Sequence, residues 1–275
     1  MADPMYRQIA DDLRRQIDEG DLAPGEQLRT EMELREKYNA SRNTVRDAIK
    51  WLITRGLVET RPGQGTFVFE RINPFVTTLS REPETGGGSV EGPIYRQEVE
   101  EVSRIPDSTV PRVEIQQAGE TAATALGLSL DAPIVSRHYQ RYIDGTPWSL
   151  QTSFYPMSLI ERGALRLIQA TDITEGTVAY LRNELRIRQT GYRDLITVRA
   201  PTETETAFFK LPDNGRVGVF EILRIAFDEQ RAPFRLTVSV YPTDRNQFAV
   251  NIGDVPVEAA VPATADSPAV ATSDE

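Results

Sequence analysis

The stretch SRNTVRDAIKWLITRGL, residues 41–57, decides the fold of the first part of this chain. Apolar residues recur in it at helical spacing and predict one buried helix face: Val45, Ala48, Ile49, Leu52 and Ile53. Ser41 is a favourable N-cap, and Gly56 suits the position just beyond the helix end. Arg42, Arg46 and Lys50 are spaced by four residues, so they form a single stripe on the outward face. The stretch predicts an amphipathic helix with a cationic outer side.

The residues on either side of this helix predict two earlier helices and a later β-hairpin. Apolar residues at helical spacing within residues 6–17, followed by Gly20, predict the first helix. Thr30 and Glu33 match a capping box, which predicts a short second helix. The sequence LVETRPGQGTFVF, residues 57–69, predicts two strands joined by a Pro-Gly turn. Three helices and a hairpin make a winged helix-turn-helix, which we expect over residues 1–70.

The cationic stripe points to contact with DNA. In a helix-turn-helix the third helix is the recognition helix, and its first residues reach base edges in the major groove. The positive end of the helix dipole at Arg42 also favours a phosphate. The wing tip, residues 63–66, is small enough to approach a groove. The alternative is that the stripe is only the solvated side of an amphipathic helix, but the ordered series of elements favours DNA binding.

Composition limits the other possibilities. The chain of 275 residues has a net charge of −10 and no cysteine, which excludes disulfides and thiolate metal sites. Residues 41–61 nevertheless hold five cations against two carboxylates, so any DNA contact is expected to be local. No apolar run approaches the roughly 18 residues that cross a bilayer, and the first residues lack a signal-peptide pattern. We expect a cytoplasmic protein with no membrane partner.

The first seventy residues resemble the DNA-binding domain of the GntR family. The match covers nearly all of residues 5–69 and includes Pro24-Gly25, Ser41-Arg42, Thr44-Val45-Arg46, Gly56-Leu57 and the wing Gly63-x-Gly65-Thr66. One difference is Arg29-Thr30, where the family usually has Pro-Ser; it keeps the helix cap and adds a cation. The resemblance implies that these residues bind an operator, with Gly65 in the minor groove: Arg29, Thr30, Glu31, Ser41, Arg42, Asn43, Thr44, Arg46, Lys50, Gln64, Gly65 and Thr66.

The remaining residues predict a linker, a second domain and a tail. Residues 71–94 include the run ETGGGS and are expected to be a linker. Residues 95–252 predict an α+β domain on a mainly antiparallel sheet, with one hairpin turning at Asp144-Gly145 and another joining residues 217–227 to 234–241. Thr174 is expected to begin a helix that contains Val178 and Leu181. Residues 253–275 read as a disordered tail.

Two predicted strand faces in this domain mix arginine with tyrosine. Arg137, Tyr139 and Arg141 share one face of the first hairpin, and Arg235 and Tyr241 share one face of the last. Arginine offers a bidentate fork to carboxylate or phosphate, and tyrosine adds apolar area with one hydroxyl. These faces predict an internal pocket for an anionic ligand. The alternative is that they are the solvated side of a half-covered sheet.

This domain resembles the UTRA effector domain of the HutC subfamily, which has a chorismate-lyase-like fold. The similar segments are residues 137–148, 196–211 and 223–248. Sugar-phosphate sensors of this group place two arginines, two residues apart, before the Asp-Gly hairpin and a glutamate on the returning strand. Here Tyr139 and Gln151 stand at two of these positions, which argues against an amino-sugar phosphate. The resemblance implies effector-binding residues at Arg137, Tyr139, Arg141, Gln151, Arg224 and Tyr241.

We expect a DNA-binding transcriptional regulator, by family analogy a repressor, whose operator affinity is modulated by a small anionic metabolite. A homodimer on a palindromic double-stranded operator is expected, because one small helix covers too few base pairs. One alternative is an enzyme of lyase-like fold, but His138 is the sole histidine and faces away from Arg137. Neither a catalytic triad nor a metal site or cofactor is predicted. The other alternative is a ligand-independent plasmid-maintenance or structural DNA-binding factor.

Overall fold

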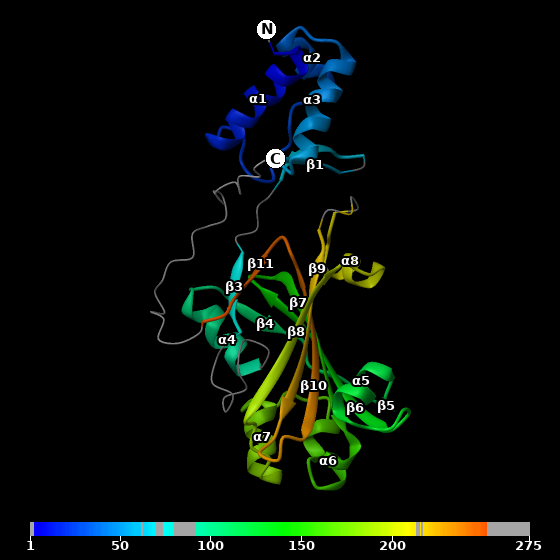
Figure 1. The fold of residues 1–275 in the computed structure, drawn as a ribbon. Coiled ribbons are helices and arrows are strands. Elements are labelled where there is room, and N and C mark those ends of the chain that lie inside the picture. Colours follow the sequence, from blue (N-terminus) through cyan, green and yellow to red (C-terminus); the bar gives the residue numbers. More distant parts are fainter. Residues whose placement is uncertain are drawn as a thin grey trace, which may run out of the picture. The chain divides into compact units, whose positions relative to one another are not determined.

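The chain folds into two compact units, residues 1–73 and residues 74–275 (Figure 1). The structure is a computed structural model that describes residues 3–61, 63–69, 74–79, 92–212, 215 and 217–251. The glycine-rich run at residues 84–89 and the predicted tail from residue 253 lie outside the described residues. Within the described part, none of the helices combines the length and the apolar character that a membrane crossing requires.

The amino-terminal unit has the helices and wing that its sequence predicts. Its elements are α1 (Met5–Asp18), α2 (Glu31–Tyr38), α3 (Arg42–Thr54), β1 (Val58–Arg61) and β2 (Gly65–Val68). The hydroxyl of Ser41 accepts the backbone N–H of Thr44 at 3.2 Å, so Ser41 caps α3. Both halves of the capping box formed by Thr30 and Glu33 are present at α2. The winged helix-turn-helix is confirmed.

The turn before α2 pairs with strand β2 of the wing through backbone hydrogen bonds. The backbone N–H of Leu28 donates to the carbonyl of Thr66 at 2.7 Å. The N–H of Gly25 donates to the carbonyl of Val68 at 3.0 Å, and the N–H of Val68 donates back to Glu26 at 2.8 Å. Residues 25–28 therefore tie β2 to the helical part, which holds the wing in a fixed position relative to α3.

The carboxy-terminal unit is built on a seven-stranded antiparallel sheet, so the α+β prediction is confirmed. The strand order is β4-β6-β7-β10-β9-β8, with β5 beside β6. The hairpin between β6 and β7 turns at Asp144 and Gly145, with φ of 51° and 72°, as two-residue hairpins require. The strands are β4 (Pro106–Ser108), β5 (Arg112–Gln117), β6 (Pro133–Ile143), β7 (Thr146–Pro156), β8 (Gly191–Arg199), β9 (Val219–Phe227) and β10 (Pro233–Pro242).

Short helices cover this sheet. They are α4 (Gly92–Glu101), α5 (Glu120–Leu126), α6 (Met157–Glu161), the 3-10 turn η2 (Leu165–Ile168), α7 (Thr177–Leu185) and α8 (Glu203–Phe209). The prediction that Thr174 begins a helix is wrong, because α7 begins at Thr177. The preceding Gly176 has φ 85° and ψ 148°, a backbone conformation that cannot continue a helix.

A small parallel pair of strands joins distant parts of the carboxy-terminal unit. β3 (Phe75–Thr78) pairs with β11 (Asn246–Ala249). Both β3 and the start of α4 fall inside residues 71–94, which the sequence predicts to be an unstructured linker. The difference has a simple cause: four residues that pair with a strand some 170 positions later leave no periodicity in the local sequence.

Candidate functional site

Arg42 and Arg46 lie on the exposed face of α3 and share one carboxylate. The Nε atom of Arg42 donates to one oxygen of Glu31 at 3.3 Å, and the Nε atom of Arg46 donates to the other at 3.1 Å. The two arginine side chains are nevertheless 65% and 60% exposed. Glu31, in the first turn of α2, therefore holds both guanidinium groups at a fixed spacing while most of their surface faces solvent.

The other predicted operator contacts surround this pair. Arg29, Asn43 and Lys50 are exposed, and Lys50 continues the stripe one turn beyond Arg46. Thr44 bonds to the hydroxyl of Ser41 at 2.8 Å, so these two side chains are engaged in the cap of α3. The structure thus places the charged stripe outside the apolar core of the unit, as the helical spacing predicts.

The wing tip is held by Gln27, which is not among the predicted operator contacts. Its side-chain amide donates to the carbonyl of Gln64 at 2.8 Å. Gly65 has φ 129°, and a Cβ atom there would lie 2.4 Å from Nε2 of Gln27. A side chain at Gly65 would be strained by this backbone conformation, and the exposed amide of Gln27 would have to move aside and give up its bond to the wing tip. The positive φ is therefore the main reason for a glycine here.

In the carboxy-terminal unit, the strand register gathers polar side chains from two hairpins on one face of the sheet. Tyr139 on β6 lies opposite Gln151 on β7, which lies opposite Ser239 on β10. The neighbouring row runs from Arg137 through Ser153, Thr237 and Arg224 to Asp194. Both arginines of the second row, Arg137 and Arg224, are buried, as is Arg141 beside the first. This face is therefore an interior layer and not the solvated side of a half-covered sheet.

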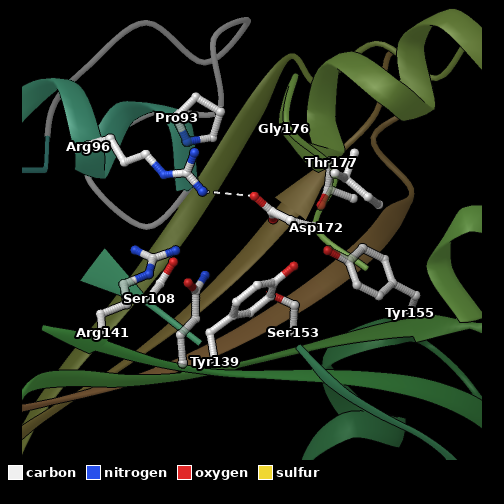
Figure 2. A pocket seen from close by; sticks show the side chains of 12 residues that line it. Pro93, Arg96, Ser108, Tyr139, Arg141, Ser153, Tyr155, Asp172, Gly176 and Thr177 are labelled. Atoms are coloured by element: carbon white, nitrogen blue, oxygen red, sulfur yellow. Dashed lines mark hydrogen bonds and ion pairs between the residues drawn. The ribbon is translucent and has the colours of Figure 1, made fainter. Parts of the chain in front are cut away.

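A cavity lies over this polar face (Figure 2). It holds about 20 Å³, room for about one water molecule. Three of the predicted effector-binding residues line it, namely Tyr139, Arg141 and Gln151. The other lining residues are Pro93, Arg96, Ser108, Ser153, Tyr155, Asp172, Ile173, Gly176 and Thr177. The lining is rich in hydroxyl groups and contains one buried cation, Arg141, whose pKa is lowered by burial.

An ion pair connects two walls of this cavity. The Nη2 atom of Arg96 on α4 lies 2.8 Å from Oδ2 of Asp172, in the loop that precedes α7 (Figure 2). Both side chains are partly exposed, so the pair lies toward the solvent side of the cavity, whereas Arg141 lies in the interior. In this conformation, in which the cavity is small, the ion pair links α4 to the loop.

Arg137 does not line the cavity but organises its wall. Its guanidinium donates to the carbonyls of Arg166 (3.1 Å), Leu167 (3.0 Å), Gln169 (2.7 Å) and Thr171 (2.7 Å). It also donates to the hydroxyl oxygen of Tyr139 at 3.1 Å. Because that oxygen accepts from Arg137, the hydroxyl proton of Tyr139 remains available for another acceptor. Arg137, which the sequence predicts to bind the effector, thus shapes the loop and orients Tyr139 in this structure.

Arg224 and Tyr241 also lie away from the lining of the cavity. Arg224 forms a two-pronged ion pair with Asp194, at 2.7 and 2.6 Å, and its guanidinium lies 3.9 Å from the ring centre of Tyr192. Tyr241 packs with Leu79 and other apolar residues, and burial raises its pKa. Strand alternation identified the correct face for both residues, but it does not say how far along the sheet the cavity extends.

Several lining residues were not predicted. Ser153 and Tyr155 follow Gln151 at a spacing of two and could have been found by continuing that strand face. Burial raises the pKa of Tyr155 to about 12, so its hydroxyl keeps its proton. Arg96 and Asp172 come from a helix and a loop far apart in the sequence, and no local pattern brings them together.

The remaining candidate for catalysis lies on the other face of the sheet. Nδ1 of His138 lies 2.8 Å from the hydroxyl of Thr152, and burial lowers the pKa of the imidazole. Among the described residues, no group of three histidine, cysteine or carboxylate side chains is arranged to hold a metal ion. His138 therefore has a structural role and does not line the cavity.

Comparisons with known proteins agree with both units. Residues 5–68 match the family described as bacterial regulatory proteins, gntR family, and residues 102–247 match the UTRA domain. The transcriptional regulator YurK of Bacillus subtilis, itself uncharacterized, is 27% identical over 250 residues, which cover 90% of this chain and 95% of YurK. The transcriptional repressor NagR of the same organism is 24% identical over 255 residues, covering 89% of this chain and 93% of NagR.

A solved structure has the same arrangement of elements. The crystal structure of a protein assigned to the GntR family superimposes with a TM-score of 0.62 and 25% sequence identity, covering 92% of this chain and 98% of that one. A helix-turn-helix unit implies DNA binding, and a UTRA domain implies a small-molecule effector. Proteins of this kind are regulators and not enzymes, which decides against the lyase alternative. The chain belongs to the GntR family of transcriptional regulators, in the HutC subfamily that joins a helix-turn-helix unit to a UTRA effector domain.

Proposed function

We propose that this protein is a repressor that binds a palindromic operator as a homodimer and whose operator affinity changes when a small anionic metabolite enters the cavity of the carboxy-terminal unit. The observation that carries the DNA-binding part is the pair formed by Arg42 and Arg46, exposed on a capped helix and held by Glu31. Similarity to the repressor NagR supports the sign of regulation.

The arginine pair is suited to reading bases. A guanidinium that binds O6 and N7 of guanine contributes roughly 1–3 kcal/mol of discrimination. Nε of each arginine donates to Glu31, and both side chains remain mostly exposed, so their outer nitrogens can serve as donors to a base. Holding the side chains in place before binding reduces the conformational entropy lost on the DNA. Lys50 and Arg29 supply phosphate contacts, which add affinity without sequence information.

The cavity is suited to an anion with several hydrogen-bonding groups. Arg141 is a buried cation, so a ligand carboxylate or phosphate would offset the cost of its desolvation. Tyr139 has a hydroxyl proton to donate, and Gln151 and Ser153 stand beside it on the neighbouring strand. These groups together favour a small polar anion over an apolar ligand.

Ligand entry requires the cavity to widen, because the space of about 20 Å³ holds only water. The ion pair between Arg96 and Asp172 is the contact that an incoming anion would disturb, since it competes with Asp172 for Arg96. Moving α4 in this way would favour one conformation of the protein. To change operator occupancy about tenfold, the ligand must discriminate between two conformations by about 1.4 kcal/mol.

The DNA-binding part is tested by fluorescence anisotropy with a labelled fragment from upstream of the protein's own gene. The wild type is expected to bind this fragment more tightly than a scrambled duplex of equal length. The variant Arg42→Ala should lose most of this preference, whereas Arg14→Ala, an exposed arginine of α1, should keep it. Equal binding of both duplexes by the wild type would contradict the proposal.

The effector part is tested by thermal shift against a panel of small carboxylates and phosphorylated metabolites. A true effector should raise the melting temperature of the wild type and change its binding to DNA without being consumed. The variant Arg141→Met should lose the shift, and Arg162→Met, an exposed arginine elsewhere in the unit, should retain it. A protein that binds DNA specifically and responds to no ligand would instead be a ligand-independent DNA-binding factor.

A further inference from the structure

Strand β8 ends the order of the sheet and carries exposed apolar side chains on both of its faces. Within the described part of the chain it pairs with β9 on one side, and no strand pairs with its other side. Leu195 is 57% exposed, Ile196 44% and Val198 60%. All three lie at or beyond the centre of a nine-residue strand that contains no proline.

Such an edge is a surface that proteins normally cover. An unpaired edge strand presents a row of backbone N–H and C=O groups that can pair with another strand, and natural proteins usually blunt it with charge, proline or a bulge. Here the charged residues Arg193 and Asp194 are confined to one end and Arg199 to the other. Asp194 is already bound to Arg224, and Arg199 to Glu205 and Glu221. The middle of the edge is therefore neutral and apolar.

Apolar hollows flank the same edge on both sides of the sheet. Leu195 lies opposite Leu223, which lines a groove that continues over Val238 and Phe154. On the other side, Ile196 lines a hollow together with Phe220 and Phe248. An apolar surface that continues around an edge strand is typical of a contact with another protein.

We infer that β8 pairs with β8 of a second copy of this chain, antiparallel across a two-fold axis, so that the two sheets join. The inference rests on the proposed homodimer and assigns its contact surface. A second copy fits because an antiparallel strand edge is self-complementary about a two-fold axis, which is the symmetry that a palindromic operator requires. A second copy would also bring its own Leu195, Ile196 and Val198 to the hollows on both sides of the sheet.

The charges select the position of the axis. In a sheet that continues across a two-fold axis normal to it, a residue pairs only with residues of its own face, so the axis passes through one residue. An axis at Ile196 would place Arg193 opposite Arg199 of the second copy, two like charges. An axis at Leu195 avoids this too, but it places the charged Asp194 opposite Ile196 of the second copy. An axis at Thr197 instead places Ile196 opposite the Val198 of the second copy, so that this face of the contact is apolar on both sides. We therefore assign the axis to Thr197.

The chain's own last residues are a poorer partner. The sequence from residue 252 onward has prolines at 256, 262 and 268, which leave five residues between them. Proline cannot donate to a strand ladder, and this part of the sequence contains no run of nine residues without proline to match the nine residues of β8. A second copy of β8 has no such interruption.

The absence of cysteine from the natural chain allows a direct test. In the full-length variant Thr197→Cys, the two introduced thiols of a dimer would be neighbours at about the Cα separation of a disulfide, 4.4–6.8 Å. Mild oxidation should therefore convert most of the protein to a covalent dimer on a non-reducing gel. The control Ser129→Cys, exposed in the loop before β6, should remain largely monomeric. Equal cross-linking of the two variants would overturn the assignment.

A second test measures mass in solution. Light scattering should give the wild type about twice the chain mass of 30.8 kDa, without DNA. The double variant Leu195→Lys, Val198→Lys should be monomeric, because it places four cations in the contact. The matched variant Val102→Lys, Val110→Lys changes two exposed apolar residues outside β8 and should remain dimeric. A wild-type monomer, or a dimeric Leu195→Lys, Val198→Lys variant with an unchanged circular dichroism spectrum, would overturn the inference.

These results separate the contact surface from the proposed function. The β8 variant should still bind a single half-site about as well as the wild type, and it should bind the full palindrome at least tenfold more weakly. If wild-type dimers form through β8 but bind no DNA, the repressor proposal fails and the contact stands. If the β8 variant binds the palindrome as tightly as the wild type and as a dimer, the contact is elsewhere.

Discussion

Glu31 illustrates how one residue determines the behaviour of two others. Its carboxylate is shared between Arg42 and Arg46, which lowers the positive charge of the stripe and fixes its geometry. The variant Glu31→Gln should strengthen binding to scrambled DNA, because one negative charge beside the phosphates is removed. It should also reduce the preference for the operator, since the arginines lose their common anchor. Anisotropy on operator and scrambled duplexes measures both; an unchanged ratio of the two affinities would contradict this role.

The arginines of the carboxy-terminal unit differ in burial, so substitutions of them should change the free energy of unfolding by different amounts. Arg137 is buried and donates to four carbonyls, so Arg137→Ala should cost about 3–5 kcal/mol because these acceptors lose their donor, and in the described part of the structure only the carbonyl of Arg166 keeps another one, a backbone N–H. The ion pair of Arg96 with Asp172 is partly exposed, and Arg96→Gln should cost less than about 1 kcal/mol. Chemical denaturation followed by the fluorescence of Trp148 in this unit measures the two free energies of unfolding. Similar costs would show that Arg137 is not the organiser of the loop.

At the residue scale, the sequence predicts which side chains lie on the polar face but not which of them line the cavity. Tyr139, Arg141 and Gln151 line it, whereas Arg137 and Arg224 are consumed by partners on the same face. Strand alternation has a period of two and carries no information on which loops and helices cover the strand. Arg96 and Asp172 depend entirely on that covering layer.

At the scale of elements, caps explain why the amino-terminal unit was predicted well. Ser41 and the capping box at Thr30 are local signals, and both form as expected. The variant Ser41→Ala should destabilise this unit by about 1 kcal/mol, because the N–H of Thr44 loses its acceptor. For a unit of this size the midpoint of its thermal transition should fall by about 4–8 °C. Circular dichroism of the full chain measures this, and Ser158→Ala within α6 serves as a control that touches no N-cap.

Elements held by distant contacts were predicted less well. β3 depends on β11, and the start of α7 depends on the conformation of Gly176 against Pro93, whose ring lies 3.2 Å from the position of a Cβ atom at this glycine. Neither contact leaves a pattern in its own neighbourhood. The sheet, by contrast, is formed by neighbouring hairpins, so its antiparallel character could be read from turns such as Asp144-Gly145.

At the scale of the whole molecule, a chain with a net charge of −10 is proposed to bind DNA through a few local cations. Operator affinity should fall steeply with salt, with a slope of about −0.9 per phosphate neutralised on a log–log plot. The variant Lys50→Ala should reduce the magnitude of this slope by about 1 and weaken operator and scrambled duplexes alike. A slope that does not change would mean that Lys50 lies outside the contact with the phosphates.

The division into two units follows from the sequence because the two halves carry different patterns, helical spacing first and strand alternation later. What the sequence does not contain is the coupling between a ligand and the operator, which we propose to depend on how α4 and the loop of Asp172 respond to an anion. That response is a difference between two conformations of the protein. A local pattern in the sequence indicates at most one of these conformations, so it cannot predict the response.

The most direct measurement of the central claim, that α3 reads the operator through Arg42 and Arg46, is the affinity of the wild type and of Arg42→Ala for a set of operators with every base pair changed in turn. Arg42→Ala is expected to lose discrimination at one base pair in each half-site, by roughly 1–3 kcal/mol, and to keep it at the others. A uniform loss at all positions, or none, would contradict the claim.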